Sequence, residues 1–288
     1  MITKDGKKIA FITDTSCDLE NNQYDDIFVI PLQVSISSCD GIKSFRDRQE
    51  LSIEDLKKYF TKQYDIKTSQ ASIKDMFQMV EKLNDKYDEV YVFPIHRKLS
   101  GNYNSWNAMC DDYPKMKVFF LDDVGSGMSW SILDIYAKVK EGLLSSSNIQ
   151  NYIETQFWPN KFGMLTTLDM KQLAKGGRVS NTKALLAKLL RIRPLIMFDQ
   201  NGLVFYDKIN SNKDFFTKVR KYSAKKWPNK IPTHAFIYTI SDKTNEIEKF
   251  VASFKETFPN LSYKTTTLPG VIVAHTGPDY FAIYFQYI

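Results

Sequence analysis

The sequence predicts an α/β protein of two domains. In the first half of the 288 residues, short apolar strand patterns alternate with longer amphipathic helix patterns. Such alternation is typical of βαβ crossovers, which build a mainly parallel sheet with helices on both faces. After the polar break at 145–148, hairpins and separate helices follow. We therefore expect a three-layer α/β/α domain over 1–158 and an α+β domain with a mixed sheet over 159–288.

Bulk composition excludes several classes of protein. The chain is 43% hydrophobic and 25% charged, which is an ordinary globular balance. It has no apolar run long enough to cross a bilayer, and its start lacks the apolar stretch of a secretory signal, so we expect a cytoplasmic protein. The three cysteines and three histidines show no metal-ligand spacing. The net charge of +6 is scattered along the chain, and we expect no nucleic-acid partner and no metal.

The first domain contains four strand patterns rich in Val, Ile, Phe and Tyr, each bounded by turn residues. These strands are expected at Ile9–Thr13, Val29–Val34, Glu89–Pro94 and Val118–Leu121. Helices are expected at Ser52–Lys62, Ser72–Tyr87, Tyr103–Cys110 and Met128–Leu144. In parallel sheets, ligands bind at the carboxyl ends of the strands. Small polar residues that follow these strands, such as Asp14 and Ser100, are therefore candidates for a binding site.

The second domain combines strand and helix patterns without regular alternation. After a short helix that ends near Trp158, strands are expected at Phe162–Thr167, Leu195–Phe198, Leu203–Tyr206, Ala235–Ile240, Thr265–Leu268, Val271–Ala274 and Tyr280–Phe285. Helices are expected at Asp169–Lys175, Asn181–Leu190, Lys213–Ser223 and Lys243–Thr257. Asn201-Gly202 is typical of a hairpin turn, and Gly176-Gly177 is typical of a helix end.

The stretch Thr68-Ser69-Gln70-Ala71-Ser72 is rich in hydroxyl and amide side chains and precedes an apolar helix pattern. Ser72 followed by Asp75 is typical of a helix N-cap. Thr68 and Ser69 are therefore expected at or just before a helix N-terminus, where unpaired N–H groups favour a carboxylate or phosphate. A helix cap without any ligand would explain the same pattern.

Three other segments are candidates for chemistry, and each has a simpler explanation. Gly101 in 99–104 lets a backbone approach closely, although a plain turn would also place a glycine there. Arg178 follows the Gly176-Gly177 helix stop and is equally consistent with an ordinary surface residue. His275 follows an apolar pattern, and a solvated loop histidine would look the same.

Taken together and in this order, these segments resemble the DegV family of bacterial fatty-acid-binding proteins. The family motifs are D-S/T-x-x-D-L, P-L-x-V, T-S-Q-P-S, L-S-G-T-Y, G-G-R-I/V-S, I-x-P-I/L and H-T-G-P-G. The matching segments are Asp14–Leu19, Pro31–Val34, Thr68–Ser72, Leu99–Tyr103, Gly176–Ser180, Ile192–Leu195 and His275–Asp279. The resemblance spans nearly the whole chain and implies a two-domain DegV-like fold.

The resemblance also implies a function. Members bind a long-chain fatty acid between the two domains and present its carboxylate to a separate fatty acid kinase, whose acyl phosphate product enters phospholipid synthesis. They are carrier subunits without catalytic residues or a cofactor, and a transient contact with a membrane surface fits this role. The resemblance assigns the carboxylate to Thr68, Ser69, Ser100 and Gly101. It places Arg178, His275, Thr276 and Asp14 near the head group or acyl phosphate.

The chain departs from the family pattern at Ala71, Asn102, Asn210 and Asp279. An alternative function is a phosphotransferase or hydrolase that uses the same pocket. Its candidate acid–base groups are Asp14, Asp122, Asp123 and His275. Against it, the sequence has neither a GxxxxGK[ST] loop nor a GxSxG nucleophile elbow.

Overall fold

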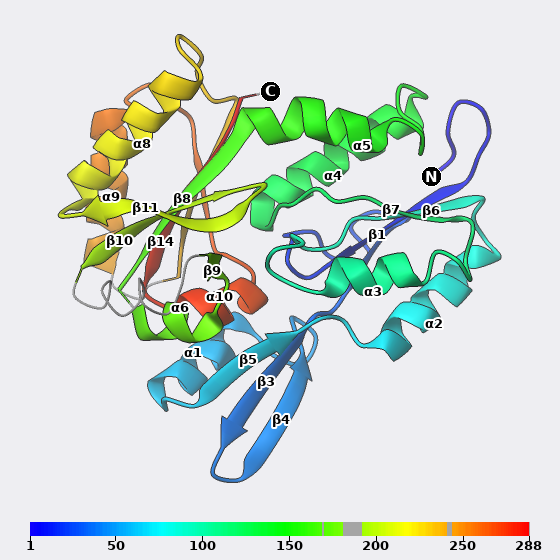
Figure 1. Ribbon diagram of the computed structural model, residues 1–288, viewed down its shortest axis with the longest axis horizontal. Helices are drawn as coiled ribbons and strands as arrows, with labels where there is room; N and C mark the ends of the chain where they lie inside the picture. Colours follow the sequence, from blue (N-terminus) through cyan, green and yellow to red (C-terminus); the bar gives the residue numbers. More distant parts are fainter. Residues whose placement is uncertain (169, 181–191, 241–243, 288) are drawn as a thin grey trace. The chain divides into compact units, whose positions relative to one another are not determined.

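The computed structural model describes residues 1–168, 170–180, 192–240 and 244–287. It divides the chain into two compact units, and each unit is built on a main sheet of its own (Figure 1). The first unit comprises Met1–Pro159 together with Pro269–Ala274, and the second comprises Asn160–Leu268 together with His275–Ile288. The stretch Pro269–Ala274 near the C-terminus therefore belongs to the first unit. A single boundary in the sequence does not describe such a division.

The first unit is built on a four-stranded parallel sheet with the order β2-β1-β6-β7. Its strands are β1 (Ile9–Asp14), β2 (Ile27–Ile30), β6 (Glu89–Val92) and β7 (Met116–Val118). Every residue of β1 is buried, as expected for a central strand covered on both faces. The strand order reverses between β1 and β6, which is the position where open parallel sheets commonly bind ligands.

The predicted helices of this unit are present, and two of them, after β6 and after β7, directly follow strands of the parallel sheet. The helical segments are α1 (Ile53–Thr61), α2 (Ile73–Asn84), α3 (Asn102–Ala108), α4 (Gly125–Lys140), α5 (Ile149–Tyr152), the π-helical turn η1 (Ile153–Phe157) and the 3-10 turn η2 (Trp158–Asn160). Ser72 caps α2 by accepting a hydrogen bond from the Asp75 N–H at 3.2 Å, which confirms the predicted N-cap. The buried face of α2 consists of Met76, Val80 and Leu83.

The first unit also contains a three-stranded antiparallel sheet that the sequence does not predict. Its order is β4-β3-β5, formed by β3 (Gln33–Ser38), β4 (Gly41–Arg46) and β5 (Asp65–Ser69). The predicted strand Val29–Val34 is divided at Pro31 and Leu32 between β2 and β3. Proline lacks the N–H that a continuous strand would use. The sequence of β4, Gly-Ile-Lys-Ser-Phe-Arg, lacks the apolar alternation that identifies strands, and none of its residues is fully buried.

The second unit is built on a seven-stranded mixed sheet with the order β13-β12-β14-β8-β10-β11-β9. Its strands are β8 (Lys161–Thr167), β9 (Val179–Ser180), β10 (Arg193–Asp199), β11 (Gly202–Ile209), β12 (His234–Thr239), β13 (Lys264–Thr266) and β14 (Tyr280–Gln286). The Asn201-Gly202 turn joins β10 to β11, with Gly202 at φ 93°. The predicted α/β fold class, with a parallel sheet and a mixed sheet, is confirmed.

The helices described in the second unit are α6 (Met170–Gly176), α8 (Asn212–Lys226) and α9 (Thr244–Thr257), and the C-terminal end of α10 (Gly270–Thr276) belongs to it as well. The core of this unit is aromatic. The ring centroids of Phe216 of α8 and Phe250 of α9 lie 4.6 Å apart. The ring centroid of Phe250 lies 4.8 Å from that of Phe281 of β14. Burial of such rings contributes much of a domain's stability. The predicted helix Asn181–Leu190 lies outside the described residues.

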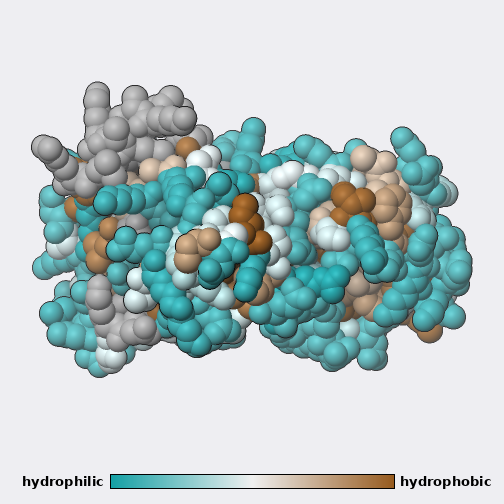
Figure 2. All heavy atoms as spheres, turned by 90° about the horizontal axis from the view of Figure 1, so that it is seen from below, coloured by the Kyte–Doolittle hydropathy of each residue, from teal (hydrophilic) through white to brown (hydrophobic). Residues whose placement is uncertain are grey.

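The surface carries no large continuous apolar area in the view of Figure 2, where hydrophilic residues surround separate apolar patches. Isolated exposed apolar side chains include Ile42 and Ile231. Single residues of this kind are normal on protein surfaces. Within the described ranges, no helix is both long enough and apolar enough to span a bilayer.

The prediction of a strand at Val271–Ala274 is wrong, because this segment forms most of helix α10. The backbone N–H groups of Ile272 and Val273 donate to the Pro269 carbonyl at 2.8 and 3.0 Å. Proline is tolerated at a helix start, where its missing N–H costs nothing. A short run of Val, Ile and Ala fits a strand and a buried helix equally well, and the Pro-Gly pair before it decides the outcome.

A buried carboxylate holds the start of α10 in the first unit. Asp47 is only 2% exposed, and the nearby Thr15 side chain and Val271 backbone both act to lower the pKa of its carboxyl. A Cβ atom at Gly270 would lie 2.6 Å from Asp47 Oδ1, so only glycine permits this approach. Burial raises the pKa of Asp47 to about 6, because the loss of solvation exceeds the opposing effects of Thr15, Val271 and the positive charge of Arg48.

The raised pKa of Asp47 predicts a pH-dependent cost in stability. The folded protein prefers the protonated carboxyl, so the cost is absent below about pH 4, grows as pH rises towards 6, and is constant above it. Asp47→Asn removes this titration. We expect its free energy of unfolding, relative to wild type, to rise by about 1–3 kcal/mol between about pH 4.5 and 7.5. Urea unfolding across this pH range measures it, with exposed Asp40→Asn as the control. A difference that does not change with pH would contradict the assignment.

Candidate functional site

Asp14 is the centre of the loops at the carboxyl edge of the first unit's parallel sheet. It is the last residue of β1 and is 0% exposed. Its Oδ1 accepts from the Ser16 N–H at 3.0 Å and the Ser16 hydroxyl at 2.5 Å. Its Oδ2 accepts from the Ile95 N–H at 2.7 Å and from Asn102 Nδ2 at 2.8 Å. Asp14 therefore organises the loops after β1 and β6, and both of its oxygens are occupied in doing so.

Burial is the main influence on the pKa of the Asp14 carboxyl. Loss of solvation raises the pKa of Asp14, while the hydrogen bonds from Ser16, Ile95 and Asn102 act in the opposite direction because they favour the ionised form. The carboxyl has no cationic partner among these donors. A buried acid held in this way is a fixed acceptor for neighbouring loops, and its geometry depends on each of the donors.

Ser100 and Gly101 lie directly before helix α3. Ser100 Oγ accepts from the Asn102 N–H at 3.2 Å, and Ser100 is partly buried. Within the described ranges, the Ser100 hydroxyl hydrogen has no acceptor in the protein, so it is available to a ligand. A Cβ atom at Gly101 would lie 3.4 Å from Gln70 Oε1, which means that the backbone here faces the Thr68–Ser72 stretch closely.

The Thr68–Ser72 stretch is joined to the loop before α3 by two hydrogen bonds. The Ala71 N–H donates to Asn102 Oδ1 at 3.3 Å, and the Ser105 hydroxyl donates to Gln70 Oε1 at 2.9 Å. The first unit therefore brings Asp14, Ser100, Gly101 and this stretch together. Thr68 and Ser69 themselves are the last residues of β5, not the start of α2, so the unpaired N–H groups of the helix do not belong to them.

In the second unit, Arg178 and His275 lie near Gly176. Arg178 donates to the Gly176 carbonyl at 2.6 Å, and a Cβ atom at Gly176 would lie 2.7 Å from His275 Nδ1. Burial, together with a smaller effect of the Arg178 charge, lowers the pKa of His275 to about 4. The imidazole is therefore neutral at pH 7, whereas the guanidinium remains charged in proteins. This cluster offers one cation and one neutral ring to a ligand.

Thr276 is 1% exposed, and its hydroxyl donates to the Gly277 carbonyl at 3.1 Å. Its own carbonyl accepts from the Thr167 hydroxyl at 2.9 Å. The Thr276 side chain therefore stabilises the turn after α10. Of the eight predicted site residues, five belong to the first unit and three, Arg178, His275 and Thr276, belong to the second.

Asn102, Gln70 and Asp47 contribute to these arrangements, although the sequence does not single them out as site residues. Asn102 stands at a position where the motif has threonine, and its polar side chain at a helix start is the one signal that points to it. Asp47 lies in the polar run Asp47-Arg48-Gln49-Glu50, which is typical of a solvated loop and carries no such signal.

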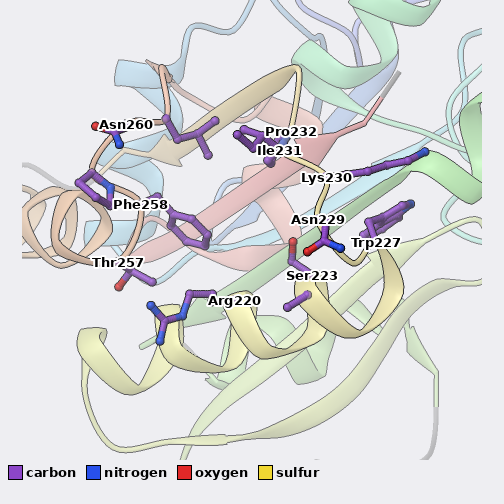
Figure 3. Close-up of a pocket in the computed structure, with 13 residues that line it drawn as sticks. Arg220, Ser223, Trp227, Asn229, Lys230, Ile231, Pro232, Thr257, Phe258 and Asn260 are labelled. Atoms are coloured by element: carbon purple, nitrogen blue, oxygen red, sulfur yellow. The ribbon is translucent and has the colours of Figure 1, made fainter.

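A surface pocket of 310 Å³ lies elsewhere in the second unit (Figure 3). Side chains from the end of α8, the loop after it and the segment after α9 line this pocket, including Trp227, Ile231 and Phe258. Arg220 and Lys230 add positive charge. None of the predicted site residues contributes to its lining, so the pocket is separate from the Arg178–His275 cluster.

The lowered pKa of His275 predicts a specific NMR titration. We expect the His275 ring to titrate near pH 4, well below the ordinary value of about 6.5. Arg178→Gln should raise this pKa only in part, because burial is the larger cause. Exposed Lys171→Gln on α6 is the control and should leave it unchanged. Ring chemical shifts followed from about pH 3.5 to 8 decide the question, and a His275 transition near 6.5 in wild type would contradict the buried, neutral ring.

Known proteins are similar to this chain over nearly its whole length. A DegV domain-containing protein of Mycoplasma genitalium is 28% identical over 96% of this chain and 97% of its own length. The crystal structure of a protein from Streptococcus agalactiae, described as a fatty acid binding DegV family protein, superposes with a TM-score of 0.83 at 20% identity, covering 98% of this chain and 100% of that one. DegV of Bacillus subtilis, described as a fatty acid binding protein, gives 0.82 at 21% identity, over 98% of this chain and 100% of that one.

A model of the DegV family, described as a family of uncharacterised proteins, matches residues 8–287. This match covers both units and includes every segment that carries the sequence resemblance. The chain belongs to the DegV family.

Proposed function

We propose that this protein binds a long-chain fatty acid, with the carboxylate at Thr68, Ser69, Ser100 and Gly101 and the tail in an apolar tunnel. The observation that carries the proposal is the hydrogen-bonded junction of the Thr68–Ser72 stretch with Ser100 and Gly101. The similar proteins of Streptococcus agalactiae and Bacillus subtilis, which are described as binding fatty acids, support it.

The proposed head-group site uses neutral donors. Hydroxyl and backbone N–H groups that donate to a carboxylate form charge-assisted hydrogen bonds, each worth about 1.5–3 kcal/mol. Ser100 is suited to this role because its hydroxyl oxygen accepts from the Asn102 N–H while its hydrogen is available. We assign Arg178, His275 and Thr276 to the region of the head group or acyl phosphate. We assign Asp14 to the same region, where it holds the loops by accepting their hydrogen bonds.

The tail supplies most of the binding energy. Burying roughly 15 methylene groups at about 0.8 kcal/mol each gives a gross gain near 12 kcal/mol. Ordering the chain and losing its free motion offset a large part of this gain. A net affinity in the micromolar to nanomolar range follows.

We also propose a protein partner and a metabolic role. As a non-catalytic carrier in the cytoplasm, it would present the carboxylate to a separate fatty acid kinase and release acyl phosphate to phospholipid synthesis, with transient contact at a membrane surface. The alternative of an enzyme is weaker, because Asp14 has both oxygens occupied and Asp122 is paired with Arg97 at 2.6 Å. Hydrolysis of acyl or phosphate esters by the protein alone would favour that alternative.

The double variant Thr68→Ala, Ser100→Ala tests the head-group site. Because it removes two charge-assisted donors, we expect affinity for palmitate to fall by about 100-fold or more, with an unchanged circular dichroism spectrum. The control is Ser145→Ala, Ser147→Ala, which removes two exposed hydroxyl groups of the same unit. Fluorescence titration with a labelled fatty acid measures both variants. Unchanged affinity in the folded Thr68/Ser100 variant would refute the assignment.

A further inference from the structure

The side chain of Asn102 connects two parts of the candidate site through one planar amide. Asn102 is 0% exposed. Its Nδ2 donates to Asp14 Oδ2 at 2.8 Å, and its Oδ1 accepts from the Ala71 N–H at 3.3 Å. Its backbone N–H also donates to Ser100 Oγ at 3.2 Å. One residue therefore contacts the carboxyl anchor, the backbone of the Thr68–Ser72 stretch and a proposed ligand-binding hydroxyl.

Asn102 and Ala71 are also two of the positions at which the chain departs from the motifs T-S-Q-P-S and L-S-G-T-Y. A proline at position 71 has no N–H and needs no acceptor there. Ala71 is 1% exposed and does have an N–H, which must be paired because an unpaired buried donor is unfavourable. Asn102 supplies the acceptor that this N–H requires.

Threonine at position 102 would not make the same set of contacts. Its hydroxyl is one short group with a single hydrogen, whereas the asparagine amide carries its donor and its acceptor on separate atoms that point in different directions. Asp14 Oδ2 contacts the nitrogen of the Asn102 amide, and the Ala71 N–H contacts its oxygen. The two departures therefore meet at one hydrogen bond, from the Ala71 N–H to Asn102 Oδ1.

On this basis we infer that Asn102 is a positioning residue for the carboxylate site, and that its effect depends on the residue at position 71. The inference rests on the proposed function for its ligand. Asn102 holds the stretch that carries Thr68 and Ser69 against the loop that carries Ser100, so that hydroxyl groups from both segments serve one head group. The Ser105–Gln70 hydrogen bond and the close approach of Gly101 to Gln70 support the same junction.

A set of variants in the full chain tests the inference: Asn102→Thr, Ala71→Pro, and the two combined. The ligands are palmitate and hexadecanol, which share a tail length and differ at the head. We expect Asn102→Thr to weaken palmitate binding by about tenfold or more and hexadecanol binding by less than about twofold. The combined variant should bind palmitate within about threefold of wild type, because proline no longer needs the acceptor. Exposed Asn104→Thr on the same helix is the control and should change neither affinity.

The inference is overturned if the effects of the two substitutions are additive, or if Asn102→Thr weakens both ligands equally. Ala71→Pro alone removes the same hydrogen bond by deleting its donor, the Ala71 N–H. It therefore serves as the test if Asn102→Thr does not fold. Hydrogen exchange of the Ala71 N–H without ligand gives a separate readout, expected to accelerate by about tenfold or more in Asn102→Thr and not in Asn104→Thr. Failure of wild type to bind palmitate would instead refute the proposed function.

Discussion

The buried carboxyl of Asp14 is the interaction on which the candidate site of the first unit depends. It accepts hydrogen bonds from the loop after β1 through Ser16, from the loop after β6 through Ile95, and from the start of α3 through Asn102. Burying an acid is unfavourable unless it is fully hydrogen-bonded. The loops that satisfy Asp14 are therefore held at fixed positions, and the proposed ligand-binding groups are attached to those loops.

The two units carry different groups at the positions predicted to bind a ligand. The first offers hydroxyl and backbone donors whose geometry is set by uncharged donors around Asp14. The second offers the charged Arg178 beside a histidine whose pKa is lowered to about 4. Neutral donors suit a carboxylate that must later be released, while a single cation suits an acyl phosphate, which carries more negative charge.

The sequence is informative where local chemistry decides structure, and less so where tertiary contacts decide it. Asp14 at the end of β1, the Ser72 cap and the Asn201-Gly202 turn each follow from residues within a few positions. The helix at Gly270–Thr276 is missed because its apolar run has no periodicity of its own. The role of Asp47 depends on Gly270, which lies far away along the chain, and that of Asn102 depends on Ala71 and Asp14. Contacts of this kind leave no pattern in a single sequence.

Native mass spectrometry of the purified protein with added palmitate tests the proposed lipid binding most directly. We expect one fatty acid per chain, retained at micromolar concentration, with hexadecanol bound more weakly because the hydroxyl donors select an ionised head group. If wild type shows no complex with palmitate before or after removal of any co-purified lipid, or binds the alcohol as tightly as the acid, the protein is not a carboxylate-selective lipid carrier.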